Sequence, residues 1–277
     1  TQPDRPAGLK MPLTPSPVKL YAITHNIPVV APESLKKNPL LQQEILKWKA
    51  EVGVVVAFGQ ILDESFMNKF QFGCVNVHAS ILPRWRGAAP IQRALEAGDR
   101  ETGVTLQKMV QKLDAGDIIG IRRVDVPPEM DAAELHDRLA FLGADLLRVE
   151  LMDFIRGNLA PIPQNEAEVT YAKKIDKSEA RLDWHKPAEL LHNKVRAFVL
   201  GPGCWCLLDG KKIKIYKTLV VEGSGSPGQI LKTDEQGITV ACGDKALRIL
   251  ELQPESRNRM PAAEFIKGYP LQGVILQ

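Results

Sequence analysis

The stretch that decides the fold is Gly73-Cys74-Val75-Asn76-Val77-His78-Ala79-Ser80, which reads as a buried strand that ends in a polar site. Successive side chains of a strand point to opposite faces, so Asn76 and His78 share one face and the valines share the other. Residues 81–87, with the sequence ILPRWRG, then form a loop at the carboxyl end of the strand. Ligands of open parallel sheets bind at that end. We therefore predict a functional site where an amide and an imidazole lie two residues apart.

Helices and apolar strands alternate around this stretch. The run at 52–58, VGVVVAF, is apolar throughout, which is typical of a strand covered on both faces of a parallel sheet. Alternation of helices with buried strands predicts an α/β fold, with an open, mostly parallel sheet and helices on both faces. The predicted helices are 17–25, 39–49, 88–97 and 131–156, and the predicted strands are 27–30, 52–58, 73–80, 103–110 and 118–124.

The second half of the chain differs from the first in composition and in its pattern of predicted elements. Residues 158–183 carry two prolines and many charges, which is typical of a linker over the surface. Beyond it, short strands separated by Gly, Ser and Pro predict a small β-barrel of the oligonucleotide-binding (OB) kind. We therefore expect a first domain at 1–157, a linker at 158–183 and a barrel domain at 184–277. The elements expected there are a helix at 187–198 and strands at 205–208, 213–221, 228–232, 237–241 and 246–251.

Composition sets the class of protein. The 277 residues are 44% hydrophobic and 25% charged, which is typical of an ordinary globular protein. No apolar run approaches the ~18 residues that a membrane span needs, so we expect no membrane partner. A net charge of +3 neither demands nor excludes a nucleic-acid partner. The four cysteines form no disulfide framework, which predicts buried strand thiols in a reducing, cytoplasmic compartment. Because the chain opens with Thr1 in a Pro-rich turn, we expect an N-terminal segment with a first strand to be absent from it.

Asp114 adds a carboxylate to the amide and the imidazole. It lies in the turn-rich loop at 111–117, and two adjacent parallel strands would bring it close to Asn76 and His78. A carboxylate orients an imidazole, and an amide donates a hydrogen bond to a developing oxyanion. Bland interpretations stay open, since a histidine at a strand end is commonly structural and Asp-Ala-Gly is an ordinary turn sequence.

One longer segment resembles a known family. Residues 76–92, NVHASILPRWRGAAPIQ, closely resemble the active-site signature of the methionyl-tRNA formyltransferases. The likeness covers nearly the whole chain and implies a Rossmann-like sheet followed by an OB-like domain. Shorter agreeing stretches lie at 1–8, 55–59, 101–105, 113–117, 252–254 and 260–262.

The resemblance implies a reaction. It is the transfer of a formyl group from 10-formyltetrahydrofolate to the α-amino group of methionine on initiator tRNA, for translation initiation. The residues that match the family's catalytic Asn, His and Asp are Asn76, His78 and Asp114, and no metal or covalent intermediate is required. The likeness also implies that one wall of the folate slot is formed by Phe58, Gly59, Gln60, Ile61 and Leu62, although Phe58 could equally be core and Gly59 a turn.

Transfer RNA is a polyanion, so we expect lysines and arginines to contact its phosphates. Lys212 and Lys214 share one face of a predicted strand with Tyr216, which suits a nucleic-acid backbone. A solvated edge strand kept soluble by its lysines is the alternative. The other expected contacts to initiator methionyl-tRNA are Arg5, Lys10, Arg84 and Arg86.

This sequence departs from the family in two places. Leu9 follows Pro6-Ala7-Gly8 where the family commonly has an arginine, and residues 199–203 read VLGPG where it usually has Pro-Trp-Pro. We expect a monomer. Two other functions stay open: another folate-dependent enzyme, such as a sugar-nucleotide or glycinamide ribonucleotide formyltransferase or a formyltetrahydrofolate hydrolase, and a non-catalytic RNA-binding protein on the same frame.

Overall fold

The structure is a computed structural model that describes residues 1–6, 12–269, 271 and 273–277. The chain divides into two compact units. The first unit contains residues 1–78, 105–121 and 146–164, and the second contains residues 79–104, 122–145 and 165–277.

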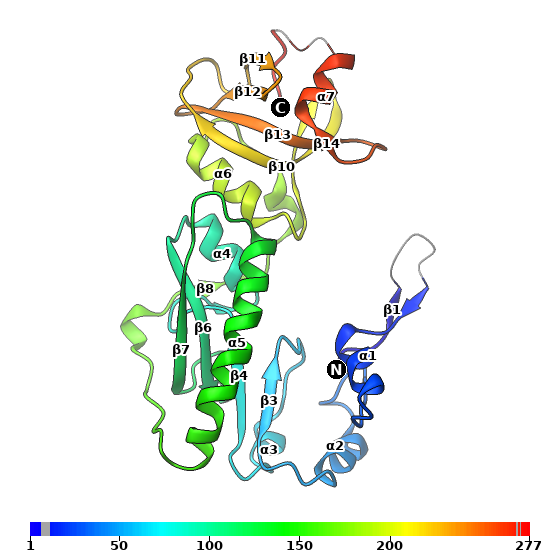
Figure 1. Ribbon diagram of the computed structural model, residues 1–277, viewed down its shortest axis with the longest axis vertical. Coiled ribbons are helices and arrows are strands. Elements are labelled where there is room, and N and C mark those ends of the chain that lie inside the picture. The colour runs from blue at the N-terminus through cyan, green and yellow to red at the C-terminus, as the bar shows by residue number, and fades with distance from the viewer. Residues whose placement is uncertain (7–11, 270, 272) are drawn as a thin grey trace. The chain divides into compact units, whose positions relative to one another are not determined.

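Helices and strands occupy most of the predicted positions (Figure 1). Among the described residues, no helix has the length and apolar character needed to cross a lipid bilayer. The α-helices are α1 (Pro17–Thr24), α2 (Pro39–Leu46), α3 (Glu64–Met67), α4 (Pro90–Glu96), α5 (Ala132–Ile155), α6 (Ala188–Ala197) and α7 (Ala262–Phe265). The strands are β1 (Arg5–Pro6), β2 (Leu13–Thr14), β3 (Gly53–Val56), β4 (Cys74–His78), β5 (Arg86–Gly87), β6 (Glu101–Lys108), β7 (Ile118–Asp125), β8 (Tyr171–Ala172), β9 (Cys204–Leu208), β10 (Lys211–Val221), β11 (Ile230–Asp234), β12 (Gly237–Ala241), β13 (Ala246–Pro254) and β14 (Met260–Pro261), and short 3-10 turns lie at Glu166–Glu168, Lys177–Ala180 and Ile266–Gly268.

Local signals explain where the early elements begin and where one is missing. Helix α1 starts as predicted, because the Ser16 side chain accepts a hydrogen bond from the Lys19 N–H and Pro17 occupies the first turn. The predicted strand at 27–30 is wrong, since no strand forms there. Pro28 has no N–H to donate to a ladder, which disfavours a paired strand.

The first sheet has the order β3-β4-β6-β7, and Figure 1 shows β3 beside β4. Strands β3 and β4 are parallel, but β4 and β6 are antiparallel, so the sheet is mixed and the mostly parallel prediction needs correction. The prediction that both faces of the 52–58 strand are covered is also wrong. Val54 and Val56, which share one face of β3, are 43% and 56% exposed. This happens because β3 is an outer strand of the sheet among the described residues.

The core of the first unit lies between α2, α3 and β4. Phe66 and Phe70 meet edge to face with their ring centroids 5.4 Å apart, and Cys74 of β4 packs in the same cluster. Edge-to-face pairs of this kind are favourable beyond the area that they bury. This cluster anchors the start of β4, the strand that carries the predicted site.

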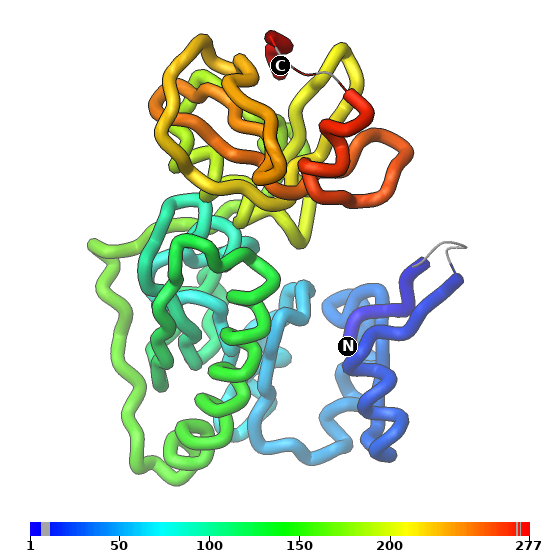
Figure 2. The backbone as a smooth tube through the Cα atoms, turned by 45° about the horizontal axis from the view of Figure 1, so that its top comes forward, coloured from blue at the N-terminus to red at the C-terminus, as the bar shows by residue number. Residues whose placement is uncertain are grey.

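The second unit contains a sheet of order β11-β12-β13-β10-β9, with β14 paired to β13. Figure 2 shows this part of the chain, yellow to orange, turning back on itself. The last described residues form hydrogen bonds with both outer strands of this sheet. The Ile230 N–H of β11 donates to the Val274 carbonyl at 3.1 Å, and the Gln277 N–H donates to the Leu207 carbonyl of β9 at 2.9 Å. The described C-terminal residues therefore link the two ends of the sheet.

All four cysteines are buried, as predicted. Burial raises the pKa of the Cys204 and Cys206 thiols to about 12, because an apolar interior disfavours the thiolate. We expect that a thiolate-selective reagent at pH 8 labels the native protein at least ~10-fold more slowly than the urea-unfolded chain, since thiolate is the reactive form. Ellman's assay on both states checks this, and rapid labelling of the native chain would contradict the burial of these strands.

Candidate active site

The predicted amide and imidazole come from one strand. Asn76 and His78 lie two residues apart on β4, so the pleat places them on the same face. The antiparallel partner β6 sets Gln107 directly opposite Asn76. It sets Thr105 opposite His78. Both members of the pair are thus held by a hydrogen-bonded ladder rather than by a loop.

The loop after β6 folds back over its own strand and carries Asp114. The Lys108 N–H donates to the Asp117 carbonyl at 2.9 Å, which closes the loop. Asp114 has a φ of 46°, in the left-handed region that an aspartate tolerates better than most residues. Gly116 fits only without a side chain, because a Cβ there would lie 1.7 Å from the Lys108 carbonyl oxygen.

The three predicted catalytic residues come together. Nδ1 of His78 lies 3.7 Å from Oδ2 of Asp114. Nδ2 of Asn76 donates to Oδ1 of the same carboxylate at 3.5 Å. The side chains of His78 and Asp114 are 7% and 14% exposed, so the cluster is largely shielded from water while remaining reachable.

The route to this cluster differs from the predicted one. The prediction relies on adjacent parallel strands to bring the three residues to one edge, but β4 and β6 run antiparallel. Instead, the returning loop lays Asp114 against the face of β4. The separation in sequence and the residue types indicate the cluster correctly, whereas the predicted topology behind it is wrong.

Two glutamines of the site are not indicated by the motifs in the sequence. Nε2 of Gln107 donates to Oδ1 of Asp114 at 3.1 Å. Nε2 of Gln164 donates to the carbonyls of Asp114 and Gly116 at 2.8 and 2.7 Å. The sequence offers one signal for Gln107, an amide that follows Leu106 within the strand predicted at 103–110, although Thr105 of the same strand is polar and buried as well.

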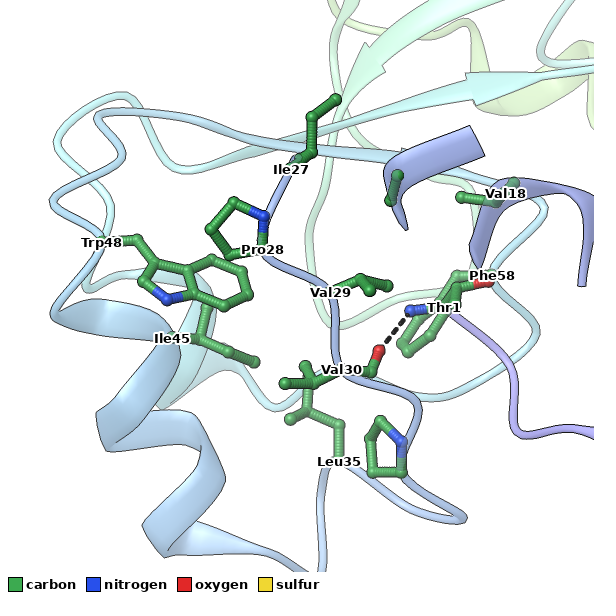
Figure 3. A pocket seen from close by; sticks show the side chains of 12 residues that line it. Thr1, Val18, Ile27, Pro28, Val29, Val30, Leu35, Ile45, Trp48 and Phe58 are labelled. Atoms are coloured by element: carbon green, nitrogen blue, oxygen red, sulfur yellow. Dashed lines mark hydrogen bonds between the residues drawn. The ribbon is translucent and has the colours of Figure 1, made fainter. Parts of the chain in front are cut away.

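The predicted folate wall begins at an apolar cavity of about 280 Å³ (Figure 3). Phe58 lines this cavity, and its carbonyl accepts a hydrogen bond from the Gln2 side chain. Gly59 follows with a φ of 72°, which turns the chain away from β3. Thr1 donates from its amino group to the Val30 carbonyl across the cavity, at 2.9 Å. The remaining lining residues are Val18, Ala22, Ile27, Pro28, Val29, Pro32, Leu35, Ile45 and Trp48.

The rest of the predicted wall has other contacts. The Gln60 side chain accepts from the Leu35 N–H at 2.8 Å and donates to the Pro32 carbonyl at 2.9 Å, so it ties down the preceding loop. Ile61 is exposed, and Leu62 packs against the core cluster of the first unit. What this stretch offers a ligand is therefore its backbone, the ring of Phe58 and the exposed side chain of Ile61.

The predicted tRNA contacts near the start of the chain and in the 81–87 loop differ in availability. Arg5 is exposed on β1 and donates to the Gln2 side chain. Lys10 lies outside the described residues. Arg84 is bound to Asp99 through two hydrogen bonds of 2.9 and 2.7 Å, and this partner raises the pKa of its guanidinium.

Arg86 is fully buried, with 0% exposure. It pairs with Glu166 at 2.8 Å, a residue that is 80 positions further along the chain. A buried guanidinium in an ion pair serves to join two segments of its unit. In this conformation the buried Arg86 guanidinium is paired with the carboxylate of Glu166, whose side chain is 59% exposed, so Arg86 itself presents no charge at the surface.

Lys212 and Lys214 lie on one face of β10 together with an indole ring. Trp205 on β9 is paired directly with Lys214 in the sheet. Nζ of Lys212 lies 4.3 Å from the centre of the Trp205 ring, and the guanidinium of Arg181 lies 5.6 Å from it. We call these four residues the cation–indole face. Trp205 is half-buried.

Comparison with known proteins identifies the class of protein to which this fold and site belong. Residues 1–150 match the family model described as Formyl transferase, and residues 174–270 match the model described as Formyl transferase, C-terminal domain. Among relatives, the methionyl-tRNA formyltransferase of Bdellovibrio bacteriovorus is 62% identical over 98% of this chain and 87% of its own length. That of Methylococcus capsulatus is 47% identical over 99% of this chain and 89% of its own. The chain belongs to the methionyl-tRNA formyltransferase family.

Solved structures share the fold at low identity. HypX from Aquifex aeolicus, in complex with tetrahydrofolic acid, superimposes with a TM-score of 0.64 at 21% identity over 82% of this chain. This chain spans only 40% of that longer protein. An N-formyltransferase from Helicobacter canadensis, in complex with folinic acid and dTDP-3-aminofucose, gives 0.63 at 19% identity over 83% of this chain and 81% of its own.

Proposed function

We propose that this protein transfers the formyl group of 10-formyltetrahydrofolate to the α-amino group of methionyl initiator tRNA, with Asn76, His78 and Asp114 as catalytic residues. The names of its relatives support the reaction, and two of its fold neighbours were solved with folates. The observation that carries the site is the convergence of an amide, an imidazole and a carboxylate at 3.5 to 3.7 Å on one sheet face.

The chemistry of these residues follows from the reaction. When the amine attacks the formyl carbon, the carbonyl oxygen gains negative charge in a tetrahedral intermediate. Asn76 donates a hydrogen bond to that oxygen, and His78 donates a second one, because preorganised donors stabilise charge that develops in the transition state. Asp114 holds the imidazole and accepts the proton that the attacking amine releases, directly or through water. When the intermediate collapses, the bond from carbon to the folate nitrogen breaks, and that nitrogen takes up the proton that Asp114 accepted from the amine, which returns the carboxylate to its starting state.

The proposed formyl donor needs an apolar slot with backbone hydrogen bonds. The Phe58 ring at the apolar cavity supports a place for a flat ring system near the end of β3. Gly59, Gln60 and Leu62 would then contribute backbone groups rather than side chains, and Ile61 would add its exposed side chain. Isothermal titration of the Phe58→Ala variant with folate tests this wall, and we expect weaker binding than for the wild-type protein. Unchanged affinity would show that the Phe58 ring does not contact the folate.

The experiment that tests the function is single-turnover transfer of a labelled formyl group to charged initiator tRNA, run beside charged elongator tRNA. We expect labelling of the initiator and little labelling of the elongator. A dTDP-amino-sugar offered as the acceptor in the same assay tests the alternative that this protein is a sugar formyltransferase, since the Helicobacter neighbour was solved with dTDP-3-aminofucose. Formylation of the sugar without formylation of the tRNA would overturn the proposal.

We also propose that the cation–indole face, with Arg5, Lys10 and Arg84, contacts tRNA. Lys212 is exposed, and Lys214 lies beside it on the same face of β10. Lysines and arginines around an indole bind both phosphates and base faces.

Replacing both lysines, as Lys212→Gln with Lys214→Gln, should weaken tRNA binding about three- to tenfold per lysine at 0.1 M salt. The slope of log K against log[salt] should fall by roughly 0.7 to 0.9 for each phosphate that the protein no longer neutralises. Filter binding across a salt series measures both quantities. The matched control is Lys36→Gln with Lys232→Gln, which removes the same charge from lysines that pair with Asp63 and Asp234. Equal slopes for the two double variants would rule out the face.

For residues 184–277 we propose an OB-like barrel, and for the chain the domain boundaries 1–157, 158–183 and 184–277. The hydrogen bonds of residues 274–277 to both ends of the sheet support closure, and the two family models support the division into domains. We further propose that the protein acts as a monomer in the cytoplasm, which sedimentation of the purified protein and fractionation of cells would test.

A further inference from the structure

A buried glutamine contacts the proposed active site from the neighbouring strand. Gln107 is 2% exposed and lies on β6 directly opposite Asn76. Its Nε2 donates to Oδ1 of Asp114 at 3.1 Å. An amide this deeply buried requires hydrogen-bond partners, because an unsatisfied one costs free energy that an apolar residue would not. Here that partner is the carboxylate of the proposed catalytic aspartate.

The glutamine distinguishes the two oxygens of that carboxylate. Oδ1 accepts from Gln107 at 3.1 Å and from Asn76 at 3.5 Å. Oδ2 is the oxygen that lies toward Nδ1 of His78, at 3.7 Å. With Oδ1 held from two sides, rotation about the bond to the carboxylate is restricted. Oδ2 therefore stays directed at the imidazole.

A second glutamine holds the backbone of the same loop. Nε2 of Gln164 donates to the carbonyls of Asp114 and Gly116, at 2.8 and 2.7 Å, and lies 3.4 Å from Oε1 of Gln107. That contact places the oxygen of the Gln107 amide toward Gln164 and its nitrogen toward Asp114. The loop is thus fixed through its main chain by Gln164 and through its carboxylate by Gln107.

We infer that Gln107 is a positioning residue for formyl transfer, acting through Asp114 by fixing which carboxylate oxygen faces His78. The inference rests on the proposed function, because it takes Asp114 as a catalytic residue. Hydrogen bonds to charged groups are the stronger ones, and their loss in the transition state appears in the rate.

The test compares Gln107→Met, which keeps the volume and removes the donor, with Gln107→Glu, which places a second carboxylate against Asp114. We expect kcat for formyl transfer, measured at steady state, to fall about 10- to 100-fold for the methionine variant and further for the glutamate variant. The KM for the formyl donor should change less than threefold in the methionine variant. The matched control is Gln229→Met, which removes a side chain that accepts from the Ser226 N–H at 3.1 Å outside the site. It should leave kcat unchanged.

A double-mutant cycle separates positioning from a structural role. In an Asp114→Asn background, Gln107→Met should cost less than threefold, since the group it acts through is already altered. Full additivity of the two losses would overturn the inference, as would wild-type kcat for Gln107→Met. If Asp114→Asn itself transfers formyl at the wild-type rate, the proposed active site fails. If Asp114→Asn is impaired and Gln107→Met is not, only the role of Gln107 fails.

Discussion

The His78→Ala variant should transfer formyl groups about 10³-fold more slowly than the wild-type protein while it binds tRNA with nearly the same affinity. The imidazole side chain is only 7% exposed, and its partner is a carboxylate. A donor in such an environment is directed at developing charge without reorganisation by water, and removing one donor of this kind typically costs 10² to 10³ in rate. Loss of the imidazole that Asp114 holds also disturbs the proton transfer assigned to that carboxylate, which adds to that cost.

The measurement is single-turnover transfer to charged initiator tRNA, with tRNA affinity determined separately by filter binding. The matched control is His136→Ala, which removes an exposed imidazole beside Asp137 on α5 and should change neither quantity. Asn76→Ala and Asp114→Asn should each lower the rate by about 10²-fold or more. Wild-type transfer by the His78→Ala variant would remove the imidazole from the chemistry. Loss of tRNA binding with normal transfer would contradict the catalytic role that we assign to His78.

Local sequence signals suffice for most elements and for the cluster itself. Alternation along β4 places Asn76 and His78 on one face, and the turn-rich loop marks Asp114, because both are short-range properties of a chain. The predicted Ser16-Pro17 helix start is correct for the same reason. The predicted direction of β6 is wrong, since strand orientation depends on how the chain returns and not on the strand's own residues.

Long-range partners are the other feature that the sequence does not predict. Arg86 lies two residues after Arg84, where the sequence leads us to expect contact with RNA, yet it is fully buried and paired with Glu166, 80 positions away. Gln107 and Gln164 are 57 residues apart and meet at one loop. Nothing in a local window indicates such partners. A polar side chain at a buried strand position, as Gln107 is on β6, signals only that some partner must exist.

Gly116→Ala should inactivate the protein about as severely as the loss of a catalytic group, although Gly116 carries no chemistry. A Cβ at this position would lie 1.7 Å from the Lys108 carbonyl oxygen and 2.8 Å from its carbon. These are backbone atoms of β6 and cannot rotate away, so the loop must lift from the strand. Lifting it would break the bond from the Lys108 N–H to the Asp117 carbonyl and the bond from Gln164 to the Gly116 carbonyl.

Asp114 would move with the loop, because it lies two residues before Gly116. A displacement of about 1 Å in a catalytic group costs roughly 10²-fold in rate. We therefore expect a loss of at least that size, accompanied by a destabilisation of about 1 to 3 kcal/mol from the overpacked contact. Transfer is measured well below the unfolding midpoint found by circular dichroism, so that the two effects separate. Gly268→Ala is the matched control, since a Cβ there meets no atom within 4 Å. A Gly116→Ala variant that transfers formyl groups at the wild-type rate would show that the position of Asp114 does not limit the reaction.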